Sequence, residues 1–375
     1  MASITKIGDG KYFVRASKGT GKNRRFINET VRGTLKDAKK VARQKETLLD
    51  LGYTPDEITL TFEKYFEKWL KAIKSKVAPR TFEDYKENIE RYALDVLRPL
   101  KLADIKPLHI QNIYDKMLER GLGPMTVRNL HAPLNACFTH AVKKEYTRKN
   151  PCKNSDLPQK SVKPKEVLSI DEAPVFVEHC EKSKNGIIFE FGLETGMRPE
   201  EYLALRWRDI DFQHNTASVN QVVVFARSGG GYTFEKCKTK KSRRLIPLSS
   251  DLRNRLMDHR RAQNEWRMQL KVSYLAHDLV FANEIGGPYA INNITRRYFK
   301  PILDKCAFGK HLTLYSLRHS CATILLIQGE NPKVVADRLG HSSVVITLDT
   351  YSHVLPHIQE AATAKMDNVL RLARK

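Results

Sequence analysis

Arg198 stands in a stretch of the chain that combines two helix-boundary signals with an acidic partner. Gly196 favours the end of one helix, because glycine tolerates the left-handed backbone of a C-terminal cap, and Pro199 suits the first turn of the next helix. Arg198 is therefore expected at a helix N-terminus, where backbone N–H groups already favour an anion. Glu201 follows one turn later and is placed to hold the guanidinium. An ordinary Arg–Glu pair on the surface would give the same pattern.

A second arginine, Arg318, lies near the start of a strongly apolar segment. Ser316 is expected to cap this helix, which puts Arg318 in its first turn. A buried arginine costs free energy unless an anion pairs with it, so this position also favours anion binding. Tyr315 lies three positions before the arginine, and His319, directly after it, is expected to point away on another face.

A histidine and a tyrosine follow further along the chain. Gly340 predicts the end of another helix, and His341 comes directly after it. Tyr351 lies ten positions later in a polar segment without a helical apolar stripe, so we expect it in a loop. Taken alone, the two residues fit one site or a surface tyrosine and an unrelated histidine equally well.

A cluster of cations marks a predicted turn between strands. Residues 216–224, 232–236 and 243–247 have the composition of strands in a small antiparallel sheet. Their second turn carries several basic side chains, and such a run is usually only a solvated face. A hairpin tip can also enter a groove and place an ammonium on a phosphate. The cations in question are Lys238, Lys240, Lys241 and Arg243.

The charge balance of the whole chain points to a polyanion. The 375 residues include 65 Lys and Arg against 42 Asp and Glu, for a net charge of +23, while 41% hydrophobic residues are enough for real cores. This excess favours nucleic acid over the alternative of a merely basic protein. The length is sufficient for two or three domains.

Several function classes lack their sequence signals. The chain has no Gly-rich loop ending in Lys-Ser/Thr, no carboxylate cluster suited to Mg²⁺ and no Cys/His group with zinc spacing. We therefore expect neither a metal nor another cofactor. Six scattered cysteines indicate free thiols in a reducing compartment. Without a signal peptide or an apolar run of membrane-spanning length, we expect a cytoplasmic protein with no membrane partner.

Local patterns divide the chain into four parts. Residues 1–50, with 13 basic and five acidic residues, predict two short strands (11–16 and 24–28) and a helix (35–49), although a solvated basic tail is the alternative. Residues 59–150 show only helical spacing, with aromatic stripes that we interpret as core. Residues 151–165 contain three prolines and predict a linker. Residues 166–375 mix helices with the small sheet and end in a helix at about 357–374.

Together these segments resemble the tyrosine recombinase family, specifically the integrases of phages and integrative elements. Each motif is weak by itself, but five of them in order at the family's spacing are specific, and the resemblance covers nearly the whole chain. The motifs are Thr195-Gly-Met-Arg198-x-x-Glu201, Lys238-Thr239, Leu317-Arg318-His319, Leu339-Gly-His341 and Leu348-Asp-Thr-Tyr351.

The resemblance implies a fold and an activity. The fold would be multidomain and mainly α with small antiparallel sheets: a ββα arm-type DNA-binding domain (1–50), a helical core-binding domain (59–150) and an α+β catalytic domain (166–375). The activity would be site-specific cutting and rejoining of DNA, without metal or ATP, to integrate and excise a mobile element. The partners would be double-stranded DNA at arm-type and core-type sites, three further copies in a homotetramer, and accessory directionality and DNA-bending proteins in a bacterial host.

The resemblance also implies residue roles. Tyr351 would be the nucleophile that forms a 3′-phosphotyrosyl intermediate, while Arg198 and Arg318 would bind the non-bridging oxygens of the scissile phosphate. Lys238 would protonate the leaving 5′ oxygen, and His341 would donate a hydrogen bond to the phosphate. Glu201 would support Arg198. Further DNA contacts are expected from Lys11, Arg24, Arg25, Lys240, Lys241 and Arg243.

One position departs from the family pattern. Tyr315 stands where the family usually has histidine, and a tyrosine hydroxyl is a poor base near neutral pH. Two alternatives therefore remain: a type IB-like topoisomerase, against which the separate basic domain argues, and a sequence-specific DNA-binding protein whose catalysis has decayed.

Overall fold

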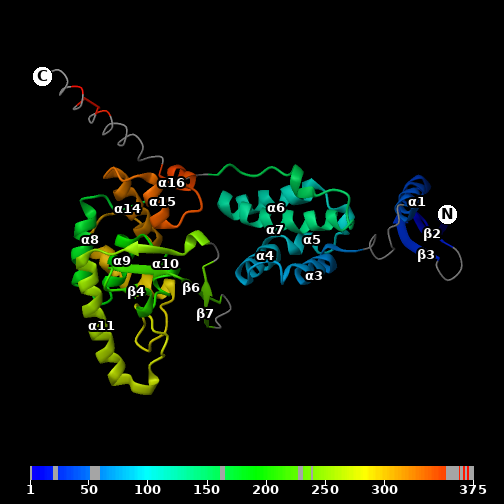
Figure 1. Ribbon diagram of the computed structural model, residues 1–375. Coiled ribbons are helices and arrows are strands. Elements are labelled where there is room, and N and C mark those ends of the chain that lie inside the picture. The colour runs from blue at the N-terminus through cyan, green and yellow to red at the C-terminus, as the bar shows by residue number, and fades with distance from the viewer. Residues whose placement is uncertain are drawn as a thin grey trace. The chain divides into compact units, whose positions relative to one another are not determined.

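The computed structural model describes residues 2–19, 24–50, 60–160, 165–226, 231–237 and 240–351, together with four single positions in the tail (Figure 1). Two compact units divide the chain, Met1–Val162 and Lys163–Lys375. In the described residues, no helix is both long and apolar enough to cross a bilayer.

The first unit begins with a three-stranded antiparallel sheet in the order β1-β2-β3, with α1 (Leu35–Asp50) packed against one face. The expectation of two strands is wrong, because β1 precedes them. Only Ala2 and Ile4 of β1 pack toward the core, and the next residue on their face is Lys6. The apolar alternation of β1 is therefore too short to identify a strand from the sequence. The strands are β1 (Ala2–Gly8), β2 (Lys11–Lys18) and β3 (Arg25–Arg32).

Helices make up the rest of the first unit, as their spacing predicts. They share one core in which the aromatic stripe of Phe62, Tyr65, Phe66 and Trp69 is fully or almost fully buried. Interpreting these aromatics as core is therefore confirmed. The helices are α3 (Phe62–Ile73), α4 (Pro79–Tyr92), α5 (Leu94–Leu97), α6 (Pro107–Glu119) and α7 (Pro124–Lys143), and a 3₁₀ turn at Pro151–Asn154 follows.

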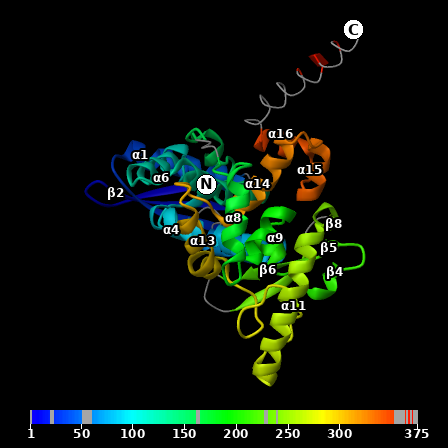
Figure 2. The same cartoon turned by 90° about the vertical axis from the view of Figure 1, so that its left-hand side faces the viewer.

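The second unit surrounds its small sheets with helices. In both views, α14, α15 and α16 lie together at one end and α11 extends away from them (Figures 1 and 2). The helices are α8 (Glu172–Glu181), α9 (Ile187–Thr195), α10 (Pro199–Tyr202), α11 (Ser250–Leu270), α12 (Ile291–Ile294), α13 (Lys300–Cys306), α14 (Leu314–Ile327), α15 (Pro332–Leu339) and α16 (Val344–Thr350), with a π-helical segment at Thr295–Phe299.

The predicted strands form two sheets instead of one. The expected strand 216–224 is interrupted at Asn220. The side-chain amide of Asn220 donates to the Asp209 carboxylate (2.9 Å), and its backbone carbonyl accepts from the backbone N–H of Cys237 (3.3 Å). One sheet has the order β4-β5-β8, and the other is a hairpin of β6 and β7. The strands are β4 (Ile210–Asp211), β5 (Thr216–Val219), β6 (Gln221–Phe225), β7 (Tyr232–Lys236) and β8 (Arg244–Pro247).

Close packing between α9 and α14 fixes the centre of the second unit. Helix α9 is buried along nearly its whole length and ends at Gly196, which has the left-handed backbone (φ 64°) predicted for a helix cap. A Cβ added at Gly196 would lie 2.8 Å from Leu339 Cδ2 and 3.1 Å from Cys321 Sγ. The turn after α9 therefore has no room for a side chain and sits directly on α14 and α15.

Replacing Gly196 by alanine should destabilise the second unit by about 2–4 kcal/mol, because left-handed backbone strain adds to overpacking. Gly309→Ala is a matched control: Gly309 has the same backbone conformation (φ 65°), but a Cβ there would meet no atom within 4 Å. The control should cost only about 1 kcal/mol. Urea unfolding followed by tryptophan fluorescence measures both. Equal losses would show that the packing around Gly196 is not tight.

Candidate active site

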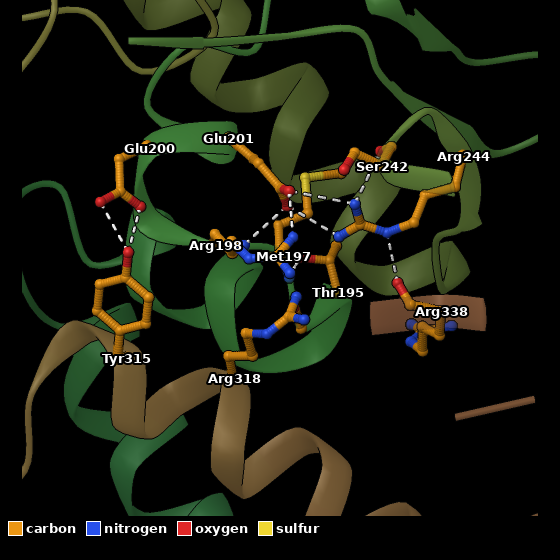
Figure 3. A network of polar contacts seen from close by, with 11 residues as sticks. Thr195, Met197, Arg198, Glu200, Glu201, Ser242, Arg244, Tyr315, Arg318 and Arg338 are labelled. Carbon is orange, nitrogen blue, oxygen red and sulfur yellow. Dashed lines mark hydrogen bonds and ion pairs between the residues drawn. The ribbon is translucent and has the colours of Figure 1, made fainter. Parts of the chain in front are cut away.

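A buried carboxylate holds two arginines together in the second unit. Glu201, in α10, has a side chain that is 2% exposed, and it accepts hydrogen bonds from Arg198 Nη1 (2.8 Å) and Arg244 Nη2 (2.8 Å) (Figure 3). The backbone N–H of Arg198 also donates to Glu201, at 2.9 Å. Burial acts to raise the pKa of Glu201, but the hydrogen bonds and charge of Arg244, with help from Arg198, lower it overall. The carboxylate is therefore ionised at neutral pH.

The pairing expected between Arg198 and Glu201 is thus present, but Arg244 is a partner that the sequence interpretation missed. Its Nε donates to the carbonyl of Arg338 at the end of α15 (2.6 Å), so Arg244 connects β8, α10 and α15. Alternation along β8 contained the signal: Arg244 and the buried Ile246 face the same side, whereas the exposed Leu245 faces the other.

The most deeply buried cation of the site is Arg318. The residue is 4% exposed, and its Nη1 donates to the carbonyl of Gly196 (2.8 Å). Its Nη2 is buried and has no hydrogen-bond partner in the described part of the chain. Burial, then the charge of Arg198, lower the pKa of Arg318 to about 10, so the group remains a cation at neutral pH.

The cap of this helix differs from the expectation. Thr313, not Ser316, caps α14, since its hydroxyl accepts from the backbone N–H of Ser316 (3.3 Å). Arg318 therefore lies in the second turn of the helix, further from the N-terminal dipole than predicted. Its preference for an anion comes from its burial and its unpaired donor.

His341 lies where the sequence predicts, directly after the left-handed cap at Gly340 (φ 70°). Its Nδ1 is 2.7 Å from the hydroxyl of Thr347. Burial, followed by the charges of Arg318, Arg198 and Arg244, lowers the pKa of His341 to about 4. The imidazole is therefore neutral at working pH and close enough to the three arginines to experience their charge.

Tyr351 is not in a loop: it is the C-terminal cap of α16, so that expectation is wrong. Helix α16 is short and rich in β-branched residues, and only Thr347 in it is buried, which explains why it leaves no apolar stripe in the sequence. Tyr351 itself is 2% exposed. Burial raises the pKa of its hydroxyl, and the charge of Arg318 acts to lower it.

His319 faces this tyrosine, contrary to the expectation that it points away from the site. The Nδ1 atom of His319 is 2.8 Å from the Tyr351 oxygen. Helical periodicity contained the signal, because His319 precedes Ala322 by three residues and Leu326 by seven, and both belong to the same buried cluster as Tyr351. The stripe that buries the tyrosine also carries the histidine.

Tyr315 is engaged with a carboxylate. It projects from the same helix as Arg318, is 40% exposed, and donates its hydroxyl to Glu200, whose oxygens lie at 2.7 and 2.6 Å (Figure 3). Burial, then the hydrogen bond with Glu200, raises the pKa of Tyr315. The residue is thus a hydrogen-bond donor at neutral pH and cannot serve there as a base.

The other predicted cations are spread over both units. Lys238 lies outside the described residues, as do the side chains of Arg25 and Lys240. Lys241 Nζ donates to the carbonyl of Ser342 (2.7 Å), next to His341, and Arg243 is exposed. In the first unit, Lys11 and Arg24 are both exposed. Among the described residues, no group of three or more His, Cys, Asp or Glu side chains could hold a metal ion.

Comparison with known proteins decides the family. Residues 164–357 match the phage integrase family, and residues 61–118 match the phage integrase N-terminal SAM-like domain. The chain belongs to the phage integrase family. The resemblance that the five motifs carry is therefore confirmed, as is the mostly helical fold with small antiparallel sheets. This integrase is a tyrosine-type site-specific recombinase that integrates mobile elements.

Three relatives illustrate the similarity. A tyrosine recombinase XerC-like protein of Caldanaerobacter subterraneus is 28% identical over 388 residues, and the match covers 98% of each chain. The ICEBs1 integrase of Bacillus subtilis is 25% identical, over 98% of this chain and all of that one. A structure of the Tn1549 transposon integrase in complex with a circular intermediate DNA shares the fold, with a TM-score of 0.68 and 21% identity over 82% of this chain and 99% of that one.

The lowered pKa of His341 predicts a pH effect on stability. The folded chain binds this proton less tightly than the unfolded chain, whose histidine pKa is about 6.5, so the contribution of His341 is present above that pH and lost as pH falls toward 4. The urea midpoint should therefore fall less between pH 7.5 and 5 in His341→Gln than in the wild type. Allowing for solvent screening, the loss of unfolding free energy between these two pH values should be roughly 1 kcal/mol smaller in the variant. His311→Gln, at an exposed histidine, should behave like the wild type; an identical pH response of all three proteins would contradict the prediction.

Proposed function

We propose that Tyr351 cleaves DNA as the nucleophile of this recombinase and that Arg198, Arg318 and His341 bind the scissile phosphate. The observation that carries the proposal is the guanidinium of Arg318. It is nearly completely buried, one of its donors lacks a partner among the described residues, and Arg198 lies close enough to lower its pKa. A phosphate oxygen is the kind of ligand that relieves both the unpaired donor and the repulsion between the two arginines.

The charges of the site support this assignment. Glu201 is the carboxylate that contacts the cluster, and both Arg198 and Arg244 already share it. Together with Arg318, the three arginines exceed this single negative charge. A phosphodiester in its transition state spreads negative charge over its oxygens, and fixed guanidinium groups in a buried site stabilise it without reorganising.

The chemical step is a transfer of the phosphoryl group to tyrosine and back. A bond forms between the Tyr351 oxygen and phosphorus, while the bond from phosphorus to the 5′ oxygen breaks, which leaves a 3′-phosphotyrosyl link. The phenol proton leaves to solvent, and the 5′ oxygen takes a proton from Lys238, the role that the family resemblance implies for this lysine. Because the phosphotyrosine conserves the bond energy, rejoining needs no ATP. Phenol is a weak nucleophile at neutral pH, so the nearby charge of Arg318 matters for its ionisation.

The surfaces of the first unit suit a role in DNA binding. We propose that residues 1–50 bind arm-type sites and that residues 59–150 and 166–375 bind core-type sites, joined by the segment 151–165, whose first turn, Pro151–Asn154, packs on the first unit. On the face of the β1-β2-β3 sheet opposite α1, the Arg15 guanidinium lies 4.1 Å from the centre of the Phe26 ring. Arg24 lies 5.2 Å from the same ring, and Lys11 is exposed at the start of β2. This basic module favours a recombinase over a type IB-like topoisomerase. We also propose that the protein acts as a homotetramer on DNA in a bacterial cytoplasm, together with accessory proteins.

The nucleophile can be tested with a suicide substrate, a core-site duplex that carries a nick near the cleavage point. The wild-type protein should become trapped in a covalent complex, and Tyr351→Phe should abolish trapping, because it removes the attacking oxygen. Arg318→Lys should slow trapping by about 10²–10³-fold, since lysine lacks the planar fork of donors. Tyr315→Phe is the matched control and should still form the complex. Trapping by Tyr351→Phe, or its complete loss in Tyr315→Phe, would overturn the assignment; failure of the wild type to trap any DNA would favour a decayed enzyme.

The unusual tyrosine has its own test. Tyr315→His should keep at least the wild-type cleavage rate on the same substrate, because imidazole can donate to Glu200 and also restores the family's usual side chain. Glu200→Gln should lower the rate only a few-fold if Glu200 merely orients the residue at position 315. Complete loss of activity in Tyr315→His would show that the hydroxyl has a role that histidine cannot replace.

A further inference from the structure

Lys165, His319 and Tyr351 form a continuous line of polar contacts. Lys165 Nζ lies 3.0 Å from His319 Nε2, and His319 Nδ1 lies 2.8 Å from the Tyr351 oxygen. The three residues come from distant parts of the second unit: the segment before α8, the helix α14, and the end of α16. Each of the two ring nitrogens of His319 therefore has a defined neighbour.

The chemistry of the two neighbours fixes the position of the imidazole proton. A lysine ammonium has three donors and no acceptor, so His319 Nε2 must accept its hydrogen bond. A neutral imidazole carries a proton on only one nitrogen. Nδ1 therefore carries it and donates to the oxygen of Tyr351. In this tautomer His319 cannot take the proton of the tyrosine.

We propose that Lys165 and His319 are a positioning pair for the nucleophile, in which the ammonium holds the imidazole in the tautomer that donates a hydrogen bond to the Tyr351 oxygen. The proposal rests on the assignment of Tyr351 as the nucleophile. Its effect is to stabilise the phenolate in both directions of the reaction, before attack on phosphorus and when the tyrosine leaves during rejoining. A hydrogen bond to a charged oxygen is about twice as strong as one between neutral groups.

Burial and nearby charges keep this histidine neutral. Burial, then the charges of Lys165 and Arg318, lowers the pKa of His319 to about 4, and His341 lies within electrostatic reach of it. The titratable groups that face His319 are therefore Lys165, Arg318, His341 and Tyr351 itself. Over the working range of the enzyme, the tautomer of His319 and not its charge is the variable that matters.

The pair also connects the proposed nucleophile to the segment before α8. Lys165 is the first described residue of the second unit, three positions after the first unit ends at Val162. Its side chain is exposed, so the ammonium can leave His319 without opening the core. Withdrawal would free His319 to adopt either tautomer, and the hydrogen bond to Tyr351 would no longer have a fixed direction.

The tautomer can be observed directly. In the full-length protein labelled with ¹⁵N-histidine, the ring signals of His319, assigned by their loss in His319→Gln, should show a protonated Nδ1 and an unprotonated Nε2 at pH 7.5. Lys165→Met should shift them toward the form protonated on Nε2. Lys182→Met, which removes an exposed ammonium that pairs with Glu178, should leave them unchanged. A wild-type protein protonated on Nε2 would overturn the proposal.

Kinetics provide the second test, in single-turnover cleavage of the nicked core-site duplex at saturating protein. His319→Asn should remain within a few-fold of the wild type, because its amide nitrogen lies close to the position of Nδ1. His319→Gln carries its donor further out and should lose roughly 10–100-fold. The cleavage rate of His319→Gln should also keep increasing up to a higher pH than the wild-type rate does, because the phenol ionises less readily without its hydrogen-bond donor. Lys165→Met should cleave a few-fold more slowly than the wild type, and Lys182→Met should cleave at the wild-type rate.

These outcomes distinguish a failure of the positioning pair from a failure of the nucleophile assignment and from a folding defect. DNA affinity and the unfolding midpoint of His319→Asn and His319→Gln should match, so that only the position of the donor differs between them. Equal rates for these two variants would overturn the donor role of His319. If Tyr351→Phe still traps DNA, the proposed function itself fails; if it does not and His319→Gln cleaves like the wild type, only the positioning pair fails.

Discussion

The cost of burying the guanidinium of Arg318 is the constraint on which the rest of the catalytic unit depends. An arginine that is 4% exposed is tolerated only if its donors and its charge find partners. The carbonyl of Gly196 supplies one partner, and it is available because α9 ends in a left-handed cap packed directly on α14. In the proposed function, the remaining donor and the excess charge bind a substrate anion, so packing that looks structural prepares the site for its chemistry.

Glu201 solves the complementary problem of holding several cations close together before substrate binds. A carboxylate shared by Arg198 and Arg244 reduces their mutual repulsion and fixes the direction of both guanidinium groups. Among the described residues, Glu201 has no hydrogen bond with Arg318, whose charge acts on the hydroxyl of Tyr351. The same carboxylate joins α10 to β8, and Arg244 extends the connection to α15, next to His341.

The sequence predicts correctly those features that depend on residues close together in the chain. Gly196 and Gly340 cap helices because of their own backbone freedom, and the aromatic stripe of 59–150 is core because its spacing matches one helix face. Contacts between distant segments escaped the prediction, including those of Arg244 with Glu201 and of Tyr315 with Glu200. Their partners are 43 and 115 positions apart, so nothing in either local pattern identifies the pair. His319 was missed for another reason: its stripe was visible, but the tyrosine that packs on that stripe follows a helix too short to predict.

The elements of the site also differ in how firmly they are held. Arg198 and Arg318 belong to segments packed in the main core of the unit, whereas Tyr351 ends a seven-residue helix whose larger apolar side chains, Val345 and Ile346, are exposed. An element with so little buried surface opens at a lower free energy than the core around it. The proposed phosphate-binding groups are therefore preorganised, and the proposed nucleophile belongs to the least firmly packed part of the site. The contact of His319 with the Tyr351 oxygen joins this weakly packed segment to α14, and in the proposed mechanism it does so at the reacting atom.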